Sequence, residues 1–372
     1  MTALLLIAAA LALLPALNTL VNVALLRTPP LPAGTPGVAI LIPARDEEAT
    51  IGACVDAALA SQGVDVEVIV LDDGSRDQTR AIVEERCRRD VRLRMASAPP
   101  LPEGWKGKPH ACQVLSQLAS RPFLLFVDAD VRLSPDAAAR LVPPAGVDLV
   151  SGVPRQIVGG AIETAVIPMI DSLIYGYLPV GLMRAMPWQA LTAACGQLIM
   201  VRAAAYRQCG GHGAVAGYMH DGMQLAKLFR RHGCRTDLVH GAALAQCRMY
   251  DNAKAVFEGF AKNATEGMAR PLALPVWTLL LAGGHLLPLV VIPAAFASGA
   301  AASPAWLAAL SSAALLLVAR VLQAVKCREP WQAVALHPLG VLLTLAIQWR
   351  ALFGYLRGRQ VQWRGRTYAP TS

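Results

Sequence analysis

The chain has 372 residues, of which 55% are apolar and only 16% are charged, and its formal net charge at pH 7 is +9. Soluble domains carry about 25% charged residues, so the composition excludes a disordered chain, a collagen-like chain and a simple cytosolic enzyme. The basic excess comes without a basic–aromatic repeat, which argues against nucleic acid as a partner and favours anionic lipid headgroups. The eight cysteines have no metal-ligand spacing and are expected to be buried thiols in a reducing compartment.

Residues 1–27 predict a transmembrane anchor. The stretch from Ala3 to Leu26 contains no charged residue and is long enough to cross about 30 Å of hydrocarbon. It lacks the basic start of a cleaved signal peptide. The first positive charge, Arg27, follows this span, so the positive-inside rule places the N terminus outside and the following residues in the cytoplasm. Residues 28–37 are a linker rich in proline and glycine.

Residues 38–270 are again rich in charged residues and predict an α/β domain. Helical segments alternate there with apolar strands, which are expected at residues 38–42, 66–71, 91–95, 123–127 and 148–153. Such alternation indicates a mostly parallel sheet with helices on both faces. Ligands of sheets of this type bind beyond the carboxyl ends of the strands.

Residues 271–356 predict a second membrane region. Residues 272–298 and 305–325 are expected to cross the bilayer, because both are long and apolar. Residues 331–356 contain polar and charged positions and are expected to be broken, interfacial or re-entrant. Residues 357–372 form a basic tail without an acidic residue, which the positive-inside rule assigns to the cytoplasm.

Acidic residues follow three of the predicted strands, in Pro43–Glu48, Asp72–Ser75 and Asp128–Asp130. Each group alone is ordinary turn or helix-cap chemistry, but three in one sheet indicate a polar site at one edge. Asp128 and Asp130 are two residues apart, so in an extended backbone both carboxylates face the same side. Carboxylates of this kind suit Mg²⁺ or Mn²⁺, which bridge them to substrate phosphates.

These motifs resemble those of family 2 glycosyltransferases of the GT-A fold. The strings are VAILIPARDEE at 38–48, LDDGSRD at 71–77 and VDAD at 127–130, and the last is similar to the DXD motif of that family. The strings GWKGK at 104–108 and RMY at 248–250, with the apolar flanks, resemble the membrane-bound branch that acts on lipids. Within it the chain looks closest to enzymes associated with hopanoid and carotenoid glycosylation, and more distantly to ceramide glucosyltransferases. The resemblance covers about residues 38–250 and implies a Rossmann-like, mostly parallel mixed sheet with flanking helices.

The resemblance also implies roles for individual residues on the donor side. It assigns the nucleotide pocket to Pro43, Ala44, Arg45 and Glu47, the base or ribose to Asp72 and Asp73, the diphosphate to Lys108, the nucleotide sugar to Asp128, and a Mg²⁺ or Mn²⁺ ion to Asp130.

On the acceptor side the resemblance implies a general base at Asp221, where His220 replaces the glutamate usual in the family. A helix cap is the alternative role of Asp221, and we expect His220 to support its neighbour rather than to bind a metal. Residues 360–364 partly resemble the QxxRW motif, with the last two residues exchanged. Trp363 and Arg364 are therefore expected either to contact the acceptor or to be interfacial anchors. Residues 163–190 are expected to form an amphipathic element at the membrane surface.

The sequence thus predicts an inverting glycosyltransferase anchored in the cytoplasmic membrane, with its catalytic domain in the cytoplasm. Its donor is expected to be a nucleotide-diphosphate sugar, by preference a UDP-sugar. Its acceptor is expected to be the hydroxyl of an isoprenoid, hopanoid, carotenoid or sphingolipid-like lipid. One alternative is a polyprenyl-phosphate glycosyltransferase, whose phosphate nucleophile needs no base. The other is a catalytically silent nucleotide-binding subunit of a membrane assembly.

Overall fold

The computed structural model describes residues 1–358, 361–363 and 366–368. It divides into two compact units. The sheet unit comprises residues 26–157 and 180–249, and the helical unit comprises residues 1–25, 158–179 and 250 onward. This division differs from the boundaries read from the sequence, because residues 158–179 and 250–270 belong to the helical unit.

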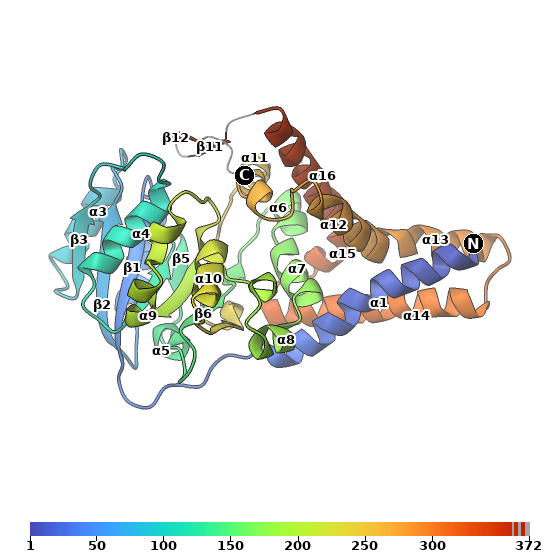
Figure 1. Cartoon of the computed structure of the whole chain (residues 1–372), viewed down its shortest axis with the longest axis horizontal. Helices are drawn as coiled ribbons and strands as arrows, with labels where there is room; N and C mark the ends of the chain where they lie inside the picture. Colours follow the sequence, from blue (N-terminus) through green and yellow to red (C-terminus); the bar gives the residue numbers. More distant parts are fainter. Residues whose placement is uncertain (359–360, 364–365, 369–372) are drawn as a thin grey trace. The chain divides into compact units, whose positions relative to one another are not determined.

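The sheet unit is built on a seven-stranded mixed sheet with the strand order β3-β2-β1-β4-β8-β6-β9; the neighbouring strands β3, β2 and β1 are labelled in Figure 1. The first four strands in this order are parallel, β8 runs antiparallel to both of its neighbours, and β6 and β9 are parallel. The predicted mostly parallel sheet is therefore confirmed, while β8 and β9 were not predicted. The strands are β1 (Gly37–Ala44), β2 (Asp65–Asp72), β3 (Leu93–Ser97), β4 (Phe123–Val127), β6 (Leu149–Gly152), β8 (Leu198–Arg202) and β9 (Thr236–Val239).

Helices cover both faces of this sheet, and β1 is therefore buried on both sides. Ile40 and Ile42 pack in one apolar core with residues of α2, α3 and α5, whereas Ala39 and Leu41 pack in a second core with residues of α4, α9 and α10. Continuous apolar strands of this kind are typical of parallel sheets covered on both faces. The helices of this unit are α2 (Ile51–Leu59), α3 (Thr79–Cys87), α4 (Gly107–Leu118), α5 (Ala137–Leu141), α8 (Val180–Ala185), α9 (Ala203–Gln208) and α10 (Asp221–Arg231).

Shorter elements complete the sheet unit. A small three-stranded sheet has the order β5-β10-β7 and follows the end of β4. Its strands are β5 (Val131–Leu133), β7 (Arg155–Gln156) and β10 (Ala245–Cys247), and the 3₁₀ helices are η1 (Gln189–Leu191), η2 (Gly211–Val215) and η3 (Gly241–Ala243). Helix η2 matters for the site below, because it carries His212.

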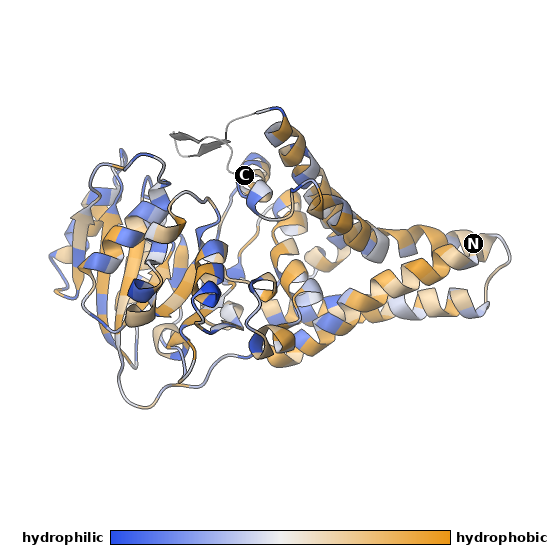
Figure 2. Cartoon of the chain, viewed as in Figure 1, coloured by the Kyte–Doolittle hydropathy of each residue, from blue (hydrophilic) through white to orange (hydrophobic). Residues whose placement is uncertain are grey.

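Among the residues that the structure describes, four helical segments of the helical unit are long and apolar enough to cross a membrane; their apolar colouring can be followed in Figure 2. They are α1 (Thr2–Leu25), residues Ala273–Ala297, α14 (Pro304–Cys327) and α16 (His337–Leu356). The second of these is made of α12 (Ala273–Leu281), the π-helical turn η5 (Ala282–Leu286) and α13 (Leu287–Ala297). The remaining elements are α6 (Ala161–Val166), α7 (Met169–Tyr177), α11 (Ala253–Lys262), η4 (Ala264–Glu266), α15 (Gln332–Ala335), β11 (Val361–Trp363) and β12 (Arg366–Tyr368).

Helix α16 differs from the broken segment expected at residues 331–356. The chain is interrupted only at Leu336, between α15 and α16, and α16 itself is continuous over 20 residues. The positions that suggested a break are His337, Pro338, Gly340, Gln348 and Arg350. His337 and Gln348 are 9% and 6% exposed and lie toward the interior of the unit, whereas Arg350 is exposed. Even with Arg350 included, α16 is long and apolar enough to cross a membrane.

A chain of hydrogen bonds runs through the helical unit. The guanidinium of Arg320 donates through Nε to His337 Nδ1 at 3.3 Å, and His337 Nε2 lies 3.0 Å from His285 Nδ1. His285 Nε2 lies 3.1 Å from the hydroxyl of Tyr177, which donates to the carbonyl of Leu280 at 3.1 Å. Arg320 also forms an ion pair of 2.6 Å with Glu329, and both side chains are 5% exposed.

Candidate functional site

The carboxyl ends of β1, β2 and β4 bring the three acidic motifs to one edge of the sheet. Ala44 pairs with Asp72 across β1 and β2, and Leu41 pairs with Phe126 across β1 and β4. The residues that follow these strands must therefore be neighbours. The sequence predicts that the three acidic motifs lie at one edge of the sheet, and the parallel register of β1, β2 and β4 brings the ends of these strands together there.

Arg45 joins the first two strand ends. Its Nη1 donates to the backbone oxygen of Asp73 at 2.8 Å and lies 3.7 Å from the Asp73 carboxylate. The Asp73 amide in turn donates to the carbonyl of Ala44 at 2.9 Å. These contacts place Arg45 and Asp73 side by side where β1 and β2 end.

The loops that follow β1 and β2 hold one another in place. Asp46 has a positive φ of 53°, which is uncommon for a residue other than glycine. Its amide donates to Ser75 Oγ at 3.0 Å, and its carboxylate accepts from the amide of Arg76 at 2.8 Å.

Glu47 is held in the same way by its amide, which donates to Thr79 Oγ1 at 2.7 Å. Asp72 accepts from the amide of Ser75 at 3.0 Å, which gives it a local role in shaping this turn.

Asp128 and Asp130 follow β4 and form a pair of neighbouring carboxylates. Burial and the charge of Asp128 raise the pKa of Asp130 to about 6, against its usual value near 4. Asp130 Oδ1 is buried and has no hydrogen-bond partner. Two repelling carboxylates with an unsatisfied oxygen are a donor set that fits a divalent cation with oxygen ligands.

Lys108, at the start of α4, links this pair to Asp221. Its Nζ lies 2.6 Å from Asp128 Oδ1 and 3.6 Å from Asp221 Oδ2, and it donates to the carbonyl of Gly196 at 3.1 Å. Burial alone would lower the pKa of Lys108, but the two carboxylates raise it well above its usual value. The ammonium group therefore stays charged between the two acids.

Asp221 is a buried carboxylate at the beginning of α10. It is the first residue of the helix, and the N-cap position belongs to His220, whose side chain makes no capping hydrogen bond. Burial would raise the pKa of Asp221, but Lys108, His212 and His220 outweigh burial and hold the pKa below its usual value. The group is therefore ionised at neutral pH and able to accept a proton.

Two glycines make room for this arrangement. A Cβ on Gly196 would lie 3.1 Å from Asp221 Oδ1 and 3.3 Å from Lys108 Nζ. A Cβ on Gly222 would lie 2.6 Å from both the Cα and the amide nitrogen of Gly196. Neither glycine is predictable from the sequence, because the importance of both depends on a contact between distant parts of the chain.

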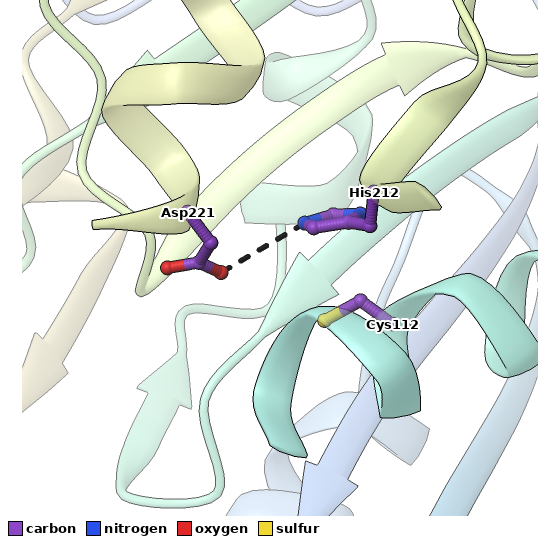
Figure 3. A group of neighbouring side chains, drawn as sticks. All are labelled: Cys112, His212 and Asp221. Atoms are coloured by element: carbon purple, nitrogen blue, oxygen red, sulfur yellow. Dashed lines mark ion pairs between the residues drawn. The ribbon is translucent and has the colours of Figure 1, made fainter. Parts of the chain in front are cut away.

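Cys112, His212 and Asp221 form a buried cluster whose ligand atoms all lie within 4.8 Å of one another (Figure 3). Thiol, imidazole and carboxylate are zinc ligands, but the ammonium of Lys108 lies 3.6 Å from Asp221 and opposes a cation at this place. Burial also raises the pKa of the Cys112 thiol well above its usual value, so the thiolate that binds metals is disfavoured. The cluster is therefore better described as the surroundings of Asp221 than as a metal site.

The remaining predicted site residues are Trp363 and Arg364, near the C terminus. The side chain of Trp363 and the whole of Arg364 lie outside the residues that the structure describes. His212 and Cys112 were not predicted. The only signal for His212 in the sequence is its position nine residues before Asp221, which is uninformative without the fold.

The chain is similar in sequence to a known family and to individual known proteins. Residues 39–208 match the model of a family described as glycosyl transferase family 2. The chain is 25% identical over 239 residues to 4,4'-diaponeurosporenoate glycosyltransferase of Staphylococcus haemolyticus (strain JCSC1435), a match that covers 63% of this chain and 62% of the relative. It is 26% identical over 240 residues to the protein of the same name from Staphylococcus aureus (strain USA300), covering 61% and 60%. The matches thus span less than two thirds of the length of these relatives.

Among solved structures, the chain is similar to the mannosyltransferase PcManGT from Pyrobaculum calidifontis, solved in complex with GDP-Man and Mn²⁺. The TM-score is 0.54 at 19% sequence identity, and the match covers 94% of this chain and 99% of that chain. At this identity the likeness shows the fold alone.

Proposed function

Because this chain belongs to glycosyl transferase family 2 and has a GT-A-like fold, we propose that it is a sugar transferase. Its donor is a nucleotide-diphosphate sugar, and its acceptor is a hydroxyl group of a membrane lipid. The observation that carries the proposal is the ionised, buried Asp221, linked through Lys108 to the carboxylate pair Asp128 and Asp130. A hydroxyl nucleophile needs a base within reach. A carboxylate or phosphate nucleophile does not.

The donor binds beyond the carboxyl ends of β1, β2 and β4. Its nucleotide lies in the surface formed by Pro43, Ala44, Arg45, Glu47 and Asp73, and Asp72 shapes the turn beside it. The contact between Arg45 and Asp73 supports this assignment, because it brings a guanidinium and a carboxylate together at one edge of the sheet. A UDP-sugar is the donor that we propose first.

Asp128 and Asp130 are the residues that would hold Mg²⁺ or Mn²⁺. The ion would supply positive charge next to the diphosphate leaving group and so stabilise its departure. The unsatisfied oxygen of Asp130 and its raised pKa support this role. Lys108 adds a second positive charge beside Asp128.

Asp221 is the general base of the proposed reaction. It takes the proton of the acceptor hydroxyl while the oxygen attacks the anomeric carbon, and the bond to the nucleotide diphosphate breaks on the opposite side, with inversion. Lys108 keeps Asp221 ionised before the reaction. His220 precedes the base and favours the same charge state.

We propose an isoprenoid-type lipid as the acceptor. Support comes from the names of the two staphylococcal relatives, which act on a carotenoid acid, and from the four helical segments able to cross a membrane. The relatives' acceptor carries a carboxyl group, and this makes a carboxylic acid the second candidate. An acid accepts sugar without a base, so the two acceptors differ in whether Asp221 is needed.

The catalytic side of the membrane is proposed to be the cytoplasm. Arg27 follows α1, and Lys326 and Arg328 flank the end of α14, and positive residues are retained on that side. A protease-sensitive tag inserted at Gly146, an exposed loop position, tests this directly. Cleavage in inverted vesicles but not in intact cells is expected, and the reverse pattern would contradict the orientation.

The experiment that tests the function is a donor and acceptor screen with membrane-embedded protein. UDP- and GDP-sugars are offered with isoprenoid alcohols, isoprenoid acids and polyprenyl phosphates, and products are identified by mass. A glycosylated alcohol is the expected product. A glycosylated phosphate alone would favour a polyprenyl-phosphate glycosyltransferase, and donor binding without any product would favour a nucleotide-binding subunit.

A further inference from the structure

His212 lies behind Asp221 in a hydrogen-bonded network that the proposed function does not yet use. The imidazole is 1% exposed. Its Nδ1 lies 2.8 Å from the hydroxyl of Tyr206, which also accepts from the His212 amide at 2.9 Å. The same hydroxyl lies 3.2 Å from Gln113 Oε1, which accepts from the amide of Gly213 at 2.9 Å. Three elements, α4, α9 and η2, thus fix the orientation of one ring.

The network and Asp221 together determine which nitrogen of His212 carries the proton. If the Tyr206 hydroxyl donates to His212 Nδ1, the hydrogen is on Nε2 and faces Asp221 Oδ2, 3.8 Å away (Figure 3). If the hydroxyl donates to Gln113 instead, Nδ1 must carry the hydrogen, and the Nε2 lone pair faces a carboxylate. Because Asp221 is ionised, the first arrangement is the favourable one.

We propose that His212 is a positioning residue for the general base: its Nε2–H orients Asp221 through Oδ2 and leaves Oδ1 for the acceptor hydroxyl. This inference rests on the proposed role of Asp221. At 3.8 Å the two atoms are not hydrogen-bonded, and we expect the contact to shorten when the acceptor is bound, as catalytic contacts commonly do. Oδ1 lies on the side of Gly196, where a Cβ would be 3.1 Å from Oδ1 and 3.3 Å from Lys108 Nζ.

The other groups around Asp221 cannot replace His212 in this role. Lys108 divides its contacts between Asp221, Asp128 and the carbonyl of Gly196. Cys112 offers only a weak thiol donor, and His220 lies at the partly exposed N-cap of α10. Burial lowers the pKa of His212 to about 4, so the ring is neutral at working pH and does not compete with Asp221 for the acceptor's proton.

The test measures the rate of sugar transfer as a function of pH in three variants. His212→Phe removes the N–H donor, His212→Gln keeps an N–H donor, and Tyr206→Phe removes the hydroxyl that fixes the tautomer. Without the donor the carboxylate form of Asp221 is less stabilised, so its pKa rises. We expect His212→Phe to lower kcat about tenfold or more and to move the acid limb of the profile to higher pH, with the donor KM unchanged.

Rescue and control variants separate positioning from a structural role. His212→Gln is expected to recover most of the rate and to return the acid limb toward its original pH, and Tyr206→Phe to shift it in the same direction as His212→Phe. His232→Phe is the matched control. His232 is the C-cap of α10, at the opposite end of the helix from Asp221, and its ring contacts the Leu228 carbonyl in the last turn of that helix. Its profile is expected to be that of the unchanged protein.

Asp221→Asn, measured alongside, distinguishes failure of this inference from failure of the proposed function. If Asp221→Asn transfers normally, the base assignment itself is wrong. If Asp221→Asn is inactive and His212→Phe keeps both its kcat and its acid limb, only the inference about His212 is overturned. Should His212→Phe not fold, an unchanged acid limb in Tyr206→Phe overturns it equally.

Discussion

Gly196 and Gly222 touch backbone to backbone: a Cβ on Gly222 would lie 2.6 Å from the Cα and the amide nitrogen of Gly196. This contact packs the first turn of α10 against the segment that leads into β8. It therefore sets where Asp221 stands relative to Lys108, which donates to the carbonyl of Gly196. The proposed base is positioned by the absence of two side chains as much as by the presence of its charged neighbours.

Gly222→Ala tests this contact. The added methyl group meets backbone atoms, which cannot rotate away, so the first turn of α10 must shift. We expect a loss of stability of about 1–3 kcal/mol and a fall in transfer rate of about tenfold or more, measured by thermal unfolding and initial rates. Gly217→Ala is the matched control, because its Cβ meets only the Gly104 carbonyl, at 3.9 Å. Equal effects of the two substitutions would contradict the argument.

Asp221→Asn is expected to slow transfer to a hydroxyl acceptor by at least about a hundredfold, because an amide cannot accept the proton. Stability should change little, since Asp221 is not the N-cap of α10 and Lys108 keeps its contact of 2.6 Å with Asp128. Donor binding should persist, and donor hydrolysis can continue with water as the nucleophile. Rates with hydroxyl and carboxylic acid acceptors are compared by product mass. Near-normal transfer to the hydroxyl acceptor would remove Asp221 from the chemistry.

Removal of divalent metal is expected to abolish transfer, and Mn²⁺ or Mg²⁺ to restore it. The reason is that Asp128 and Asp130 repel one another and would face a diphosphate without a full counter-charge. Asp130→Asn should lose the response to added metal, whereas Asp136→Asn, an exchange at an acid paired with Arg140, should keep it. Full activity in the presence of a chelator would exclude a metal from the mechanism.

The stability of the sheet unit is expected to fall as the pH falls below about 6.5, partly through His212. The pKa of this buried ring is about 4 in the folded protein, against a usual value of 6.5. Between these two pH values the unfolded chain binds a proton that the folded chain does not, so acid favours unfolding by up to about 3 kcal/mol. His212→Gln, which does not titrate, should show a shallower loss of melting temperature between pH 7 and pH 5. Parallel curves would contradict this assignment.

Arg320→Leu is expected to destabilise the helical unit by about 3–5 kcal/mol, because it leaves Glu329 buried without its partner. The double variant Arg320→Leu/Glu329→Leu should recover much of this loss, since the carboxylate of Glu329 is removed together with its partner. Thermal unfolding in detergent of the two single variants and the double variant forms the cycle that measures the coupling. Additive losses would show that the ion pair contributes nothing specific.

The meeting of the three acidic strand ends could be predicted from the sequence, because it depends on one rule. Residues that follow adjacent parallel strands meet at the same sheet edge, so the sequence alone groups Arg45, Asp73 and Asp128. The surroundings of Asp221 could be predicted less well from the sequence. Lys108 was assigned to the diphosphate, but its contact with Asp221 arises from tertiary packing between α4 and α10, which no local pattern encodes.

The helical unit shows a second limit of sequence reasoning. Residues 163–190 are predicted to form one amphipathic element at the membrane surface, whereas the structure divides them: α6 and α7 have many buried residues and belong to the helical unit, and residues 180–190 belong to the sheet unit. Asn22 on α1 donates to the carbonyls of Tyr175 and Leu178 at the end of α7, at 2.9 and 2.6 Å. Polar residues in apolar helices thus served contacts between helices rather than a water-facing surface, and the sequence does not distinguish these two uses.

The hydrogen-bond chain from Arg320 through His337 and His285 to Tyr177 has a consequence for the movement of protons within the helical unit. Because Arg320 Nε can only donate, His337 Nδ1 must accept, and every later bond in the chain then points the same way. A proton wire requires each member to take up a proton on one side and release one on the other, and a guanidinium does not release its proton. The hydrogen-bonded chain of histidines therefore ends at a group that does not pass a proton on. These polar side chains can lie between apolar helices without forming a path for protons.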